Sequence, residues 1–290
     1  MNWQLAVFIK LRRPITLKKF KVCHWWALLL LILIISVTSF LTSEKITQET
    51  KDKQIAITAF KHIDNHVLCN ENIYENKFEA IRRLETTSGY NKARQIIRLP
   101  FRDDLHIPEG YNSAWIYCGC RNDLGVDCEF GVGFEPYSNK WILFATTPEF
   151  GWHYVEGGTI TFNPGEIITL ILEVKDNKIR CTVYGSNNQK RWHKILPARG
   201  LRNDCSNGER VRIMTTLVLN EGKKAYSRNN RRFSAIVSTP NTEHQFDGSH
   251  GIAVIETKGN KGDTEWVRVK TFQPFFDEDI DLKILPNVSF

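Results

Sequence analysis

The stretch that decides the fold is residues 167–185, IITLILEVKDNKIRCTVYG. Two runs of aliphatic and β-branched residues flank KDNK, whose Asp and Asn favour a tight turn between strands. Since successive side chains of a strand point to opposite faces, alternate residues of each run share a face. We expect one such set to oppose another across the turn: Leu170, Leu172 and Val174 with Ile179, Cys181 and Val183. The stretch therefore predicts an antiparallel hairpin with one buried face.

The same pattern extends over residues 55–290. Short β-branched and aromatic runs recur at intervals of roughly ten residues and are separated by Asn, Asp, Gly and Pro. Such spacing is typical of an all-β sandwich. We predict one domain, a single antiparallel β sandwich of the jelly-roll, concanavalin-like type, with roughly 12 to 14 strands. Only YENKFEAIRRLE (74–85) fits a helix as well as a strand.

A transmembrane helix is predicted before this domain. Residues 25–41 carry no charge, and at ~1.5 Å per residue such a helix spans roughly 25 Å, close to the ~30 Å hydrocarbon core of a bilayer. Residues 1–24 hold six basic side chains and no acidic one, which favours the cytoplasm for them and the outside for the rest. We expect a retained signal-anchor at 25–42 and a polar stalk at 43–54. Small residues up to Ser39 leave cleavage and secretion as the alternative.

The distribution of charge argues against a polyanion-binding protein. The chain has 39 basic and 32 acidic residues, a formal net charge of +7. Six basic residues lie in the cytoplasmic segment, which leaves 33 basic against 32 acidic residues in the remainder. The outer domain therefore lacks the positive field that steers proteins to nucleic acid. We predict no nucleic-acid partner.

Six of the seven cysteines follow the apolar run. An even number of cysteines outside the cell is typical of disulfides. The candidates are Cys69, Cys118, Cys120, Cys128, Cys181 and Cys205. We expect at least one bridge within residues 118–205, and the alternative is that some of the six are buried free thiols. Cys118 and Cys120 stand two apart on an expected strand, so they face the same way and are expected to pair with other cysteines.

Three segments spanning about 127–185 resemble the middle of the YrpD-like family of exported bacillus proteins: DCEFGVGFEPYSNKWILFATTP, GGTITFNPGEIITLILEV and DNKIRCTVYG. The resemblance lies in a small-residue strand followed by an aromatic strand, a Pro-Gly before the next strand and a strand that ends in Gly. More loosely, the segments resemble the concanavalin-type jelly roll of lectins, laminin-G modules and some glycanases. These resemblances imply the sandwich fold and an exported location, and the YrpD-like family implies no activity.

A row of aromatic residues is the clearest candidate ligand site. EFGWHYVEGG places Trp152 and Tyr154 at alternating positions, and Trp115 and Trp141 come from nearby expected strands. Rings on a sheet face stack on sugar rings, while polar neighbours bind the hydroxyl groups. We predict that these four residues contact a carbohydrate or wall polymer. The alternative is that the rings fill the space between two sheets.

Catalytic motifs are weak. Jelly-roll glycanases use carboxylates that alternate along one strand, and FDEDIDLK sets Asp277, Asp279 and Asp281 on one face. The segment lacks the final glutamate and the neighbouring tryptophan of the glycanase pattern. Ser249 and His250 are adjacent on a loop, which does not give the Ser–His geometry of a catalytic triad. We predict no catalytic residue.

No cofactor or metal is predicted, apart from calcium, which surface loops would suit. HIDNHVLC sets His62 and His66 one helical turn apart with Cys69 three residues on, a spacing that would serve zinc in a helix, but it has no second cluster. Calcium prefers oxygen ligands. Two pairs of loop residues offer them: Asp103 with Asp104, and Asn122 with Asp123.

The densest basic run after the apolar segment is KKAYSRNNRR (223–232). Its charged residues are Lys223, Lys224, Arg228, Arg231 and Arg232. Such a run would meet an anionic wall polymer or phospholipid headgroups. The alternative is a solvated loop.

Together these features predict a membrane-anchored or exported bacterial cell-surface module that binds carbohydrate or cell-wall polymer without catalysis. Two other functions stay open. A glycan hydrolase or lyase requires the carboxylates of 277–281 to lie beside Trp152. A protein–protein interaction module requires Trp115, Trp141 and Trp152 all to be buried, with an apolar patch elsewhere.

Overall fold

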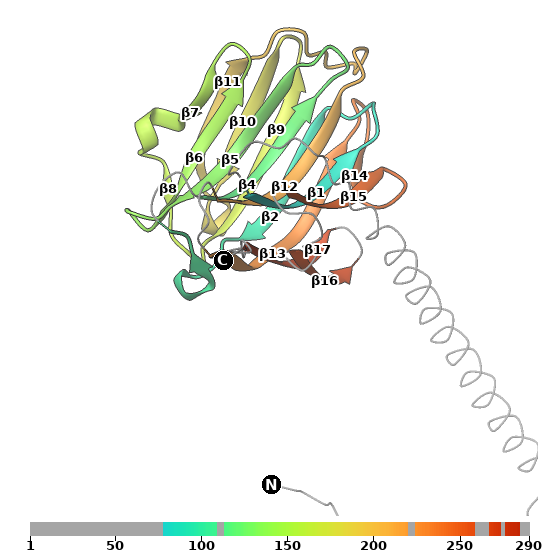
Figure 1. Cartoon of the computed structure of the whole chain (residues 1–290). Helices are drawn as coiled ribbons and strands as arrows, with labels where there is room; N and C mark the ends of the chain where they lie inside the picture. The colour runs from blue at the N-terminus through green and yellow to red at the C-terminus, as the bar shows by residue number, and fades with distance from the viewer. Residues whose placement is uncertain (1–77, 109–112, 220–223, 259–266, 274–275, 285–290) are drawn as a thin grey trace, which may run out of the picture. The chain divides into compact units, whose positions relative to one another are not determined.

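Figure 1 shows the computed structural model of the chain, in which residues 78–108, 113–219, 224–258, 267–273 and 276–284 are described. These residues form two antiparallel β-sheets packed face to face. The predicted all-β class and two-sheet sandwich are therefore confirmed. The described residues hold 17 strands, more than the roughly 12 to 14 expected, because four of the strands have only two to four residues.

Sheet 1 has eight strands in the spatial order β15-β1-β12-β4-β5-β6-β7, and β8 pairs with β6. Its strands are β1 (Phe78–Thr86), β4 (Ser113–Arg121), β5 (Asp127–Glu135), β6 (Lys140–Thr147), β7 (Gly151–Tyr154), β8 (Thr161–Phe162), β12 (Arg210–Leu219) and β15 (Gly251–Lys258). The sheet therefore has β15 and β7 at the two ends of the path, with β12, β4 and β5 between them.

Sheet 2 has nine strands in the order β11-β10-β9-β2-β13-β17-β16, and β3 and β14 both pair with β13. Its strands are β2 (Lys92–Arg98), β3 (Leu105–His106), β9 (Ile167–Lys175), β10 (Lys178–Tyr184), β11 (Lys190–Pro197), β13 (Ala225–Ser238), β14 (Glu243–Gln245), β16 (Val267–Gln273) and β17 (Asp277–Ile284). Three 3-10 turns join strands: η1 (Arg102–Asp104), η2 (Val155–Gly158) and η3 (Ser186–Asn188).

The hairpin predicted from residues 167–185 is confirmed as β9 and β10. Leu172 pairs with Cys181, and Leu170 pairs with Val183. Asn177 in the turn has φ 57°, a left-handed conformation that Asn tolerates. The alternating side chains of both strands are buried, so one face of the hairpin belongs to the core, as expected.

The segment that fits helix and strand equally forms a strand over its described part. β1 pairs with β12 on one side and with β15 on the other. The backbone N–H and C=O groups on both sides of β1 therefore have hydrogen-bond partners in the neighbouring strands. In a helix the same groups would have to bond to one another. Pairing on two sides decides the structure of a sequence whose local preference is ambiguous.

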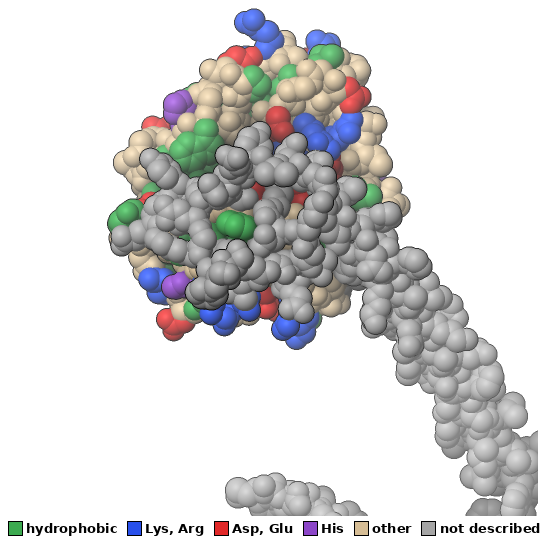
Figure 2. Space-filling model, in the orientation of Figure 1, with side chains coloured by type: hydrophobic (Ala, Val, Ile, Leu, Met, Phe, Trp, Pro, Cys, Tyr) green, Lys and Arg blue, Asp and Glu red, His purple; other side chains and the backbone are tan. Residues whose placement is uncertain are grey.

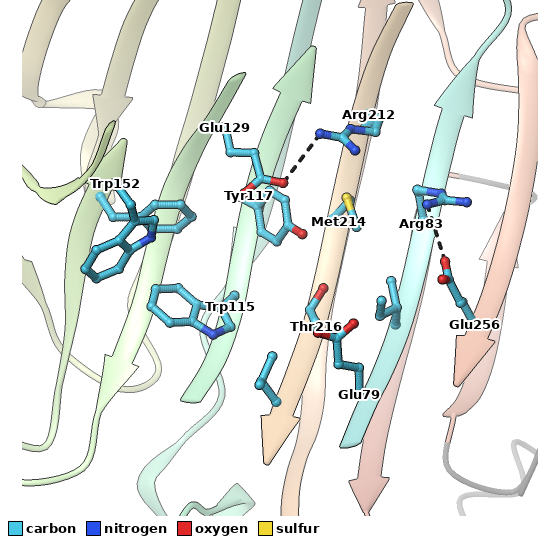
Figure 3. Close-up of a pocket in the computed structure, with 13 residues that line it drawn as sticks. Glu79, Arg83, Trp115, Tyr117, Glu129, Trp152, Arg212, Met214, Thr216 and Glu256 are labelled. Carbon is cyan, nitrogen blue, oxygen red and sulfur yellow. Dashed lines mark hydrogen bonds and ion pairs between the residues drawn. The ribbon is translucent and has the colours of Figure 1, made fainter. Parts of the chain in front are cut away.

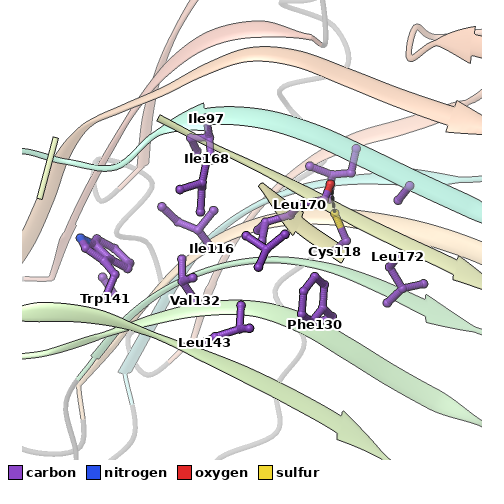
Figure 4. Close-up of a cluster of buried hydrophobic side chains, with 14 of the residues drawn as sticks. Ile97, Ile116, Cys118, Phe130, Val132, Trp141, Leu143, Ile168, Leu170 and Leu172 are labelled. Atoms are coloured by element: carbon purple, nitrogen blue, oxygen red, sulfur yellow. Dashed lines mark hydrogen bonds between the residues drawn. The ribbon is translucent and has the colours of Figure 1, made fainter. Parts of the chain in front are cut away.

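The core lies between the two inner faces (Figure 4). In sheet 1 it takes alternate residues of β5, among them Phe130 and Val132, which are fully buried. Leu170 and Leu172 of β9 face them from sheet 2. Trp141 of β6 is 0% exposed and packs with Phe134, their ring centroids 5.4 Å apart. Alternation along each strand therefore separates a dry inner face from an outer one.

An ionic cluster joins the sheets inside this core. Arg82 of β1, Arg232 of β13 and Glu278 of β17 are all 0% exposed. Nη2 of Arg82 lies 2.5 Å from Oε1 of Glu278, and Nη1 of Arg232 donates to Oε2 at 2.7 Å. Nη2 of Arg232 also donates to the hydroxyl of Thr215 at 3.3 Å. Burial alone would raise the pKa of Glu278, but the two guanidiniums outweigh it and lower the pKa.

The cysteines in the described part of the chain are free thiols: Cys118, Cys120, Cys128, Cys181 and Cys205. The predicted bridge within 118–205 is therefore not supported by the structure, and Cys69 lies outside the described residues. Four of the five pack in the core as small apolar side chains. Cys118 and Cys120 do face the same way, as expected, and Cys120 pairs across the ladder with Cys128.

The predicted cytoplasmic segment, signal-anchor and stalk, residues 1–54, lie outside the described residues. Within the described residues, none of the helices has the length and apolar character that a membrane span needs.

Candidate ligand-binding site on the outer face of sheet 1

A pocket of about 340 Å³ opens on the outer face of sheet 1, the face turned away from sheet 2. Its lining comes from β15, β1, β12, β4, β5, β6 and β7, so nearly the whole width of the sheet contributes (Figure 3). The volume falls in the range of small-ligand sites, about 300–1,000 Å³. We call it the outer-face pocket.

The ladder register explains which side chains meet there. Tyr117 of β4 pairs with Met214 of β12 and with Gly131 of β5. Gly131 in turn pairs with Phe144 of β6. These residues all point outward because their neighbours along each strand point into the core. One row across the sheet thus carries an apolar floor, which includes Phe144 at 1% exposure and Met214 at 4%.

Two glycines of β5 make room for this floor. A Cβ built on Gly133 would lie 2.2 Å from the ring of Trp115, and one on Gly131 would lie 2.2 Å from the carbonyl oxygen of Ile116. Both distances are far below any real contact, so a side chain at either position would displace its neighbour. The missing side chain of Gly133 lets the ring of Trp115 lie across β5, and that of Gly131 lets the backbone of β4 at Ile116 and Tyr117 approach closely.

Five aromatic rings form a continuous cluster at one end of the pocket. Trp115 meets Phe144 edge to face at 5.0 Å and Trp152 at 5.7 Å, measured between ring centroids. Trp152 meets Tyr154 at 4.8 Å, and Tyr117 meets Phe144 at 5.9 Å. Trp152 is 48% exposed. The cluster therefore offers solvent at least one large ring, held in place by its neighbours.

Ion pairs line the other end of the pocket. Nη1 of Arg83 lies 3.3 Å from Glu256, and Nε of Arg83 lies 3.1 Å from Glu85. Nη2 of Arg212 lies 3.4 Å from Glu129 and also contacts Asp127. Both guanidiniums are therefore paired with two carboxylates each. Figure 3 shows Arg212 of β12 reaching Glu129 of β5 across the intervening β4, and Arg83 of β1 beside Glu256 of the neighbouring strand β15.

Burial shifts the ionisation of two groups in the pocket. The pKa of Glu129 is raised, chiefly because burial disfavours its charged form, although Arg212 opposes the shift. Burial also raises the pKa of Tyr117, with the nearby charge of Glu129 as the next cause. The Tyr117 hydroxyl therefore keeps its proton at neutral pH and can act as a hydrogen-bond donor toward its polar neighbours.

Three of the four predicted ligand residues come together at this pocket. Trp115 and Trp152 line it, and Tyr154 contacts Trp152 beside it. Trp141 does not join them, because it points inward from β6 and is completely buried. The structure therefore corrects the prediction at Trp141, whose ring fills the space between the sheets. Strand parity separates it from the others, since Trp141 stands an odd number of residues from Phe144.

The carboxylates considered for catalysis lie elsewhere. Asp277, Asp279 and Asp281 do share a face of β17, as expected, but this strand belongs to sheet 2. The first two pair with Arg231, and Asp281 accepts the backbone N–H of Asn229. Trp152 lies in sheet 1, so the strand pairing does not place these carboxylates beside it.

Ser249 and His250 also follow the expectation. The Ser249 hydroxyl donates to Asp247 at 2.6 Å, and Nδ1 of His250 lies 2.8 Å from the same carboxylate. Both side chains therefore contact Asp247 instead of each other, so His250 is not positioned as a general base for Ser249.

The two loop pairs considered for calcium have protein partners. Asp104 accepts from the side chain of Asn229, and Asp123 pairs with Arg210. Oδ1 of Asn122 accepts the backbone N–H groups of Leu124 and Val126, at 3.1 Å each, and so closes its own loop. Among the described residues, no group of three or more His, Cys, Asp or Glu side chains has a geometry that would hold a metal ion. His62, His66 and Cys69 lie outside them.

Residues 225–232 of the basic run form part of strand β13 instead of a loop. Arg232 points into the core, whereas Arg231 pairs with Asp277 on the outer face. Arg228 lies over the ring of Tyr226, 4.2 Å from its centroid, and Lys224 is exposed. Lys223 lies outside the described residues. The described cations thus do not share one surface, and Figure 2 shows basic and acidic side chains interspersed on the part of this face that is coloured.

Sequence reasoning missed most of the polar half of the pocket. The missed polar residues are Glu79, Arg83, Tyr117, Glu129, Arg212, Thr216 and Glu256, and the missed apolar ones are Ile81, Phe144, Met214 and Val218. The available signal was parity: in CEFGVGF, Glu129 and the two glycines alternate with Cys128, Phe130 and Val132 of the core. Selecting the residues of each strand that alternate with core residues would have identified the lining side chains. Knowing which strands are neighbours would then have brought these side chains together in one pocket.

Comparison of the chain with protein-family models found no match, and comparison with curated proteins found none either.

Proposed function

We propose that this β sandwich is a non-catalytic glycan-binding module that holds carbohydrate or cell-wall polymer in the outer-face pocket. The observation that carries the proposal is the half-exposed ring of Trp152, supported by Trp115 and Tyr154 beside buried carboxylates and guanidiniums. Aromatic rings stack on the apolar face of a sugar, while charged groups form strong hydrogen bonds to its hydroxyls. In the outer-face pocket both kinds of group stand on one face of sheet 1.

The proposal extends to fold family and location. A concanavalin-like jelly roll, with a YrpD-like relationship, accounts for two antiparallel sheets whose outer face carries the pocket. An uncharged run of 17 residues after a basic segment supports a single-pass membrane anchor that holds the domain outside a bacterial cell, or secretion if the chain is cleaved near Ser39.

The two alternative functions have less support. The hydrolase or lyase reading relied on the carboxylates of 277–281, which are committed to partners in sheet 2. The protein-interaction reading relied on three buried tryptophans, whereas Trp152 is 48% exposed. Glycan binding needs neither condition.

The test is retention of the full-length chain, in mild detergent, on purified polysaccharides. We expect Trp152→Ala to lower retention at least tenfold, because an aromatic side chain that stacks on a ring of its ligand contributes about 1–3 kcal/mol where nucleic-acid bases are the ligand, and we take the same order for a sugar ring. The matched control is Phe272→Ala in β16 of sheet 2, since Phe272 has the same 48% exposure.

Equal retention of Trp152→Ala and the parent on a polymer that binds both would remove Trp152 from the site. Failure of the parent on every polymer tested would overturn glycan binding itself. Loss in both variants would trace the effect to general surface damage, and urea unfolding curves of all three proteins would check this directly.

A further inference from the structure

The charges of the outer-face pocket are paired before any ligand arrives. Arg83 faces Glu256 at 3.3 Å and Glu85 at 3.1 Å. Arg212 faces Glu129 at 3.4 Å and contacts Asp127. A carboxylate or phosphate group of a ligand would therefore have to compete with existing partners for either guanidinium.

Carboxylates also outnumber cations there. Two arginines and three glutamates are among the described residues that line the pocket, and the third glutamate is Glu79. The side chain of Arg212 is only 7% exposed, so its partners cannot be exchanged for water at low cost. A cation would have to separate a carboxylate from its arginine.

We propose that the pocket selects neutral, hydroxyl-rich sugars and rejects anionic polymers, an inference that rests on the glycan-binding function proposed above. A hydroxyl group both donates and accepts, so it binds beside a carboxylate–guanidinium pair without breaking it. The protonated Tyr117 hydroxyl and that of Thr216 line the same pocket and supply uncharged partners. The buried carboxylate of Glu129, whose pKa burial raises, accepts from a neutral donor at less cost than it meets a second charge.

The experiment compares retention of the full-length chain on a neutral β-glucan, on polygalacturonate and on chitosan, each at about 0.05 M and about 0.5 M salt. We expect retention on the neutral polymer at both salt concentrations, and at least tenfold weaker retention on the two charged polymers. Retention by neutral polymer that is independent of salt is the signature of hydroxyl recognition.

Preferential binding of polygalacturonate or chitosan, lost at the higher salt, would overturn this inference and leave glycan binding intact. No retention on any polymer would instead overturn the glycan-binding function. The two failures are therefore distinguishable from one set of columns.

A specificity variant tests the cause. Glu256→Gln keeps the shape of the side chain but removes one of the two carboxylates that face Arg83. We expect the variant to gain salt-sensitive retention on polygalacturonate, so that the ratio of its retention on polygalacturonate to its retention on the neutral polymer rises relative to the parent. If the variant rejects the anionic polymer as fully as the parent does, the pairing of Arg83 is not what excludes anions, and the proposed cause of the selectivity is wrong.

Discussion

Gly133 shows how one missing side chain shapes the proposed site. Its outward position on β5 lies under the ring of Trp115, 2.2 Å from where a Cβ would stand. We expect Gly133→Ala to push the indole away, to lower glycan retention and to reduce the free energy of unfolding by about 1–3 kcal/mol. Tryptophan fluorescence, retention and urea unfolding measure the three effects.

The neighbouring Val132 supplies the control, because it points into the core from the same strand. Val132→Ala should cost about 2 kcal/mol of unfolding free energy through lost packing and leave the position of Trp115 and the retention unchanged. If both variants lose retention to the same extent, the loss follows stability instead of the geometry of the pocket.

At the scale of strands, the thiols provide a test of burial. Burial raises the pKa of Cys118 to about 12, and it also raises the pKa of Cys181. Since the thiolate is the reactive form, we expect peptides that contain Cys118, Cys120, Cys128 or Cys181 to stay unlabelled by a maleimide in the native protein and to be labelled after unfolding without reductant. Mass spectrometry of the digested protein gives the result.

Thiols that stay unlabelled after unfolding, and that react once reductant is added, would contradict the free-thiol state. That outcome would restore the disulfide predicted from the sequence, with Cys120 and Cys128 as the pair that the ladder brings together. Cys205, which is partly exposed, serves as the internal comparison for accessibility.

Strand-level features were predictable because alternation is local. The β9–β10 hairpin, its register and its buried face followed from residues 167–185 alone. The pocket did not follow, because it depends on which strands become neighbours. Residues of β1 and β12 are more than 100 positions apart in sequence yet pair directly, as Arg83 does with Met214. The prediction for Trp141 was wrong for a related reason. A tryptophan suits either face of a strand, and only its position in the alternation along the strand decides which face it occupies.

At the scale of the whole molecule, the buried cluster of Arg82, Arg232 and Glu278 ties one sheet to the other. Replacing Glu278 with Gln removes the carboxylate that both buried guanidiniums contact, so we expect a loss of about 3–5 kcal/mol in unfolding free energy at neutral pH. Asp277→Asn is the control, because its pair with Arg231 is only partly buried and is expected to contribute at most about 1 kcal/mol.

The same cluster predicts how stability depends on pH. The pKa of Glu278 is lowered on folding, from an ordinary value of 4.5. Its contribution is therefore present above about pH 4.5 and is lost as pH falls through the lower, folded-state pKa. Urea unfolding of the parent and of Glu278→Gln between neutral pH and acid measures this. The parent should lose more stability than the variant, and parallel profiles would contradict the assignment.

Trp152 stands on β7, a four-residue strand at the end of the path through sheet 1, whereas the two arginines of the paired charges stand on β1 and β12, inside the sheet. Beyond it, Glu156 and Gly157 of η2 have left-handed φ angles, so the chain turns away at once. The part of the site that would stack on a sugar ring is thus carried by a short edge strand. The arginines that would determine charge selectivity are carried by strands on which the sheet itself depends. Substitution of the aromatic residues at 151–154 would therefore change the preferred sugar with little effect on the fold. Loss of the proposed exclusion of anionic polymers would require changes in the strands that form the sandwich.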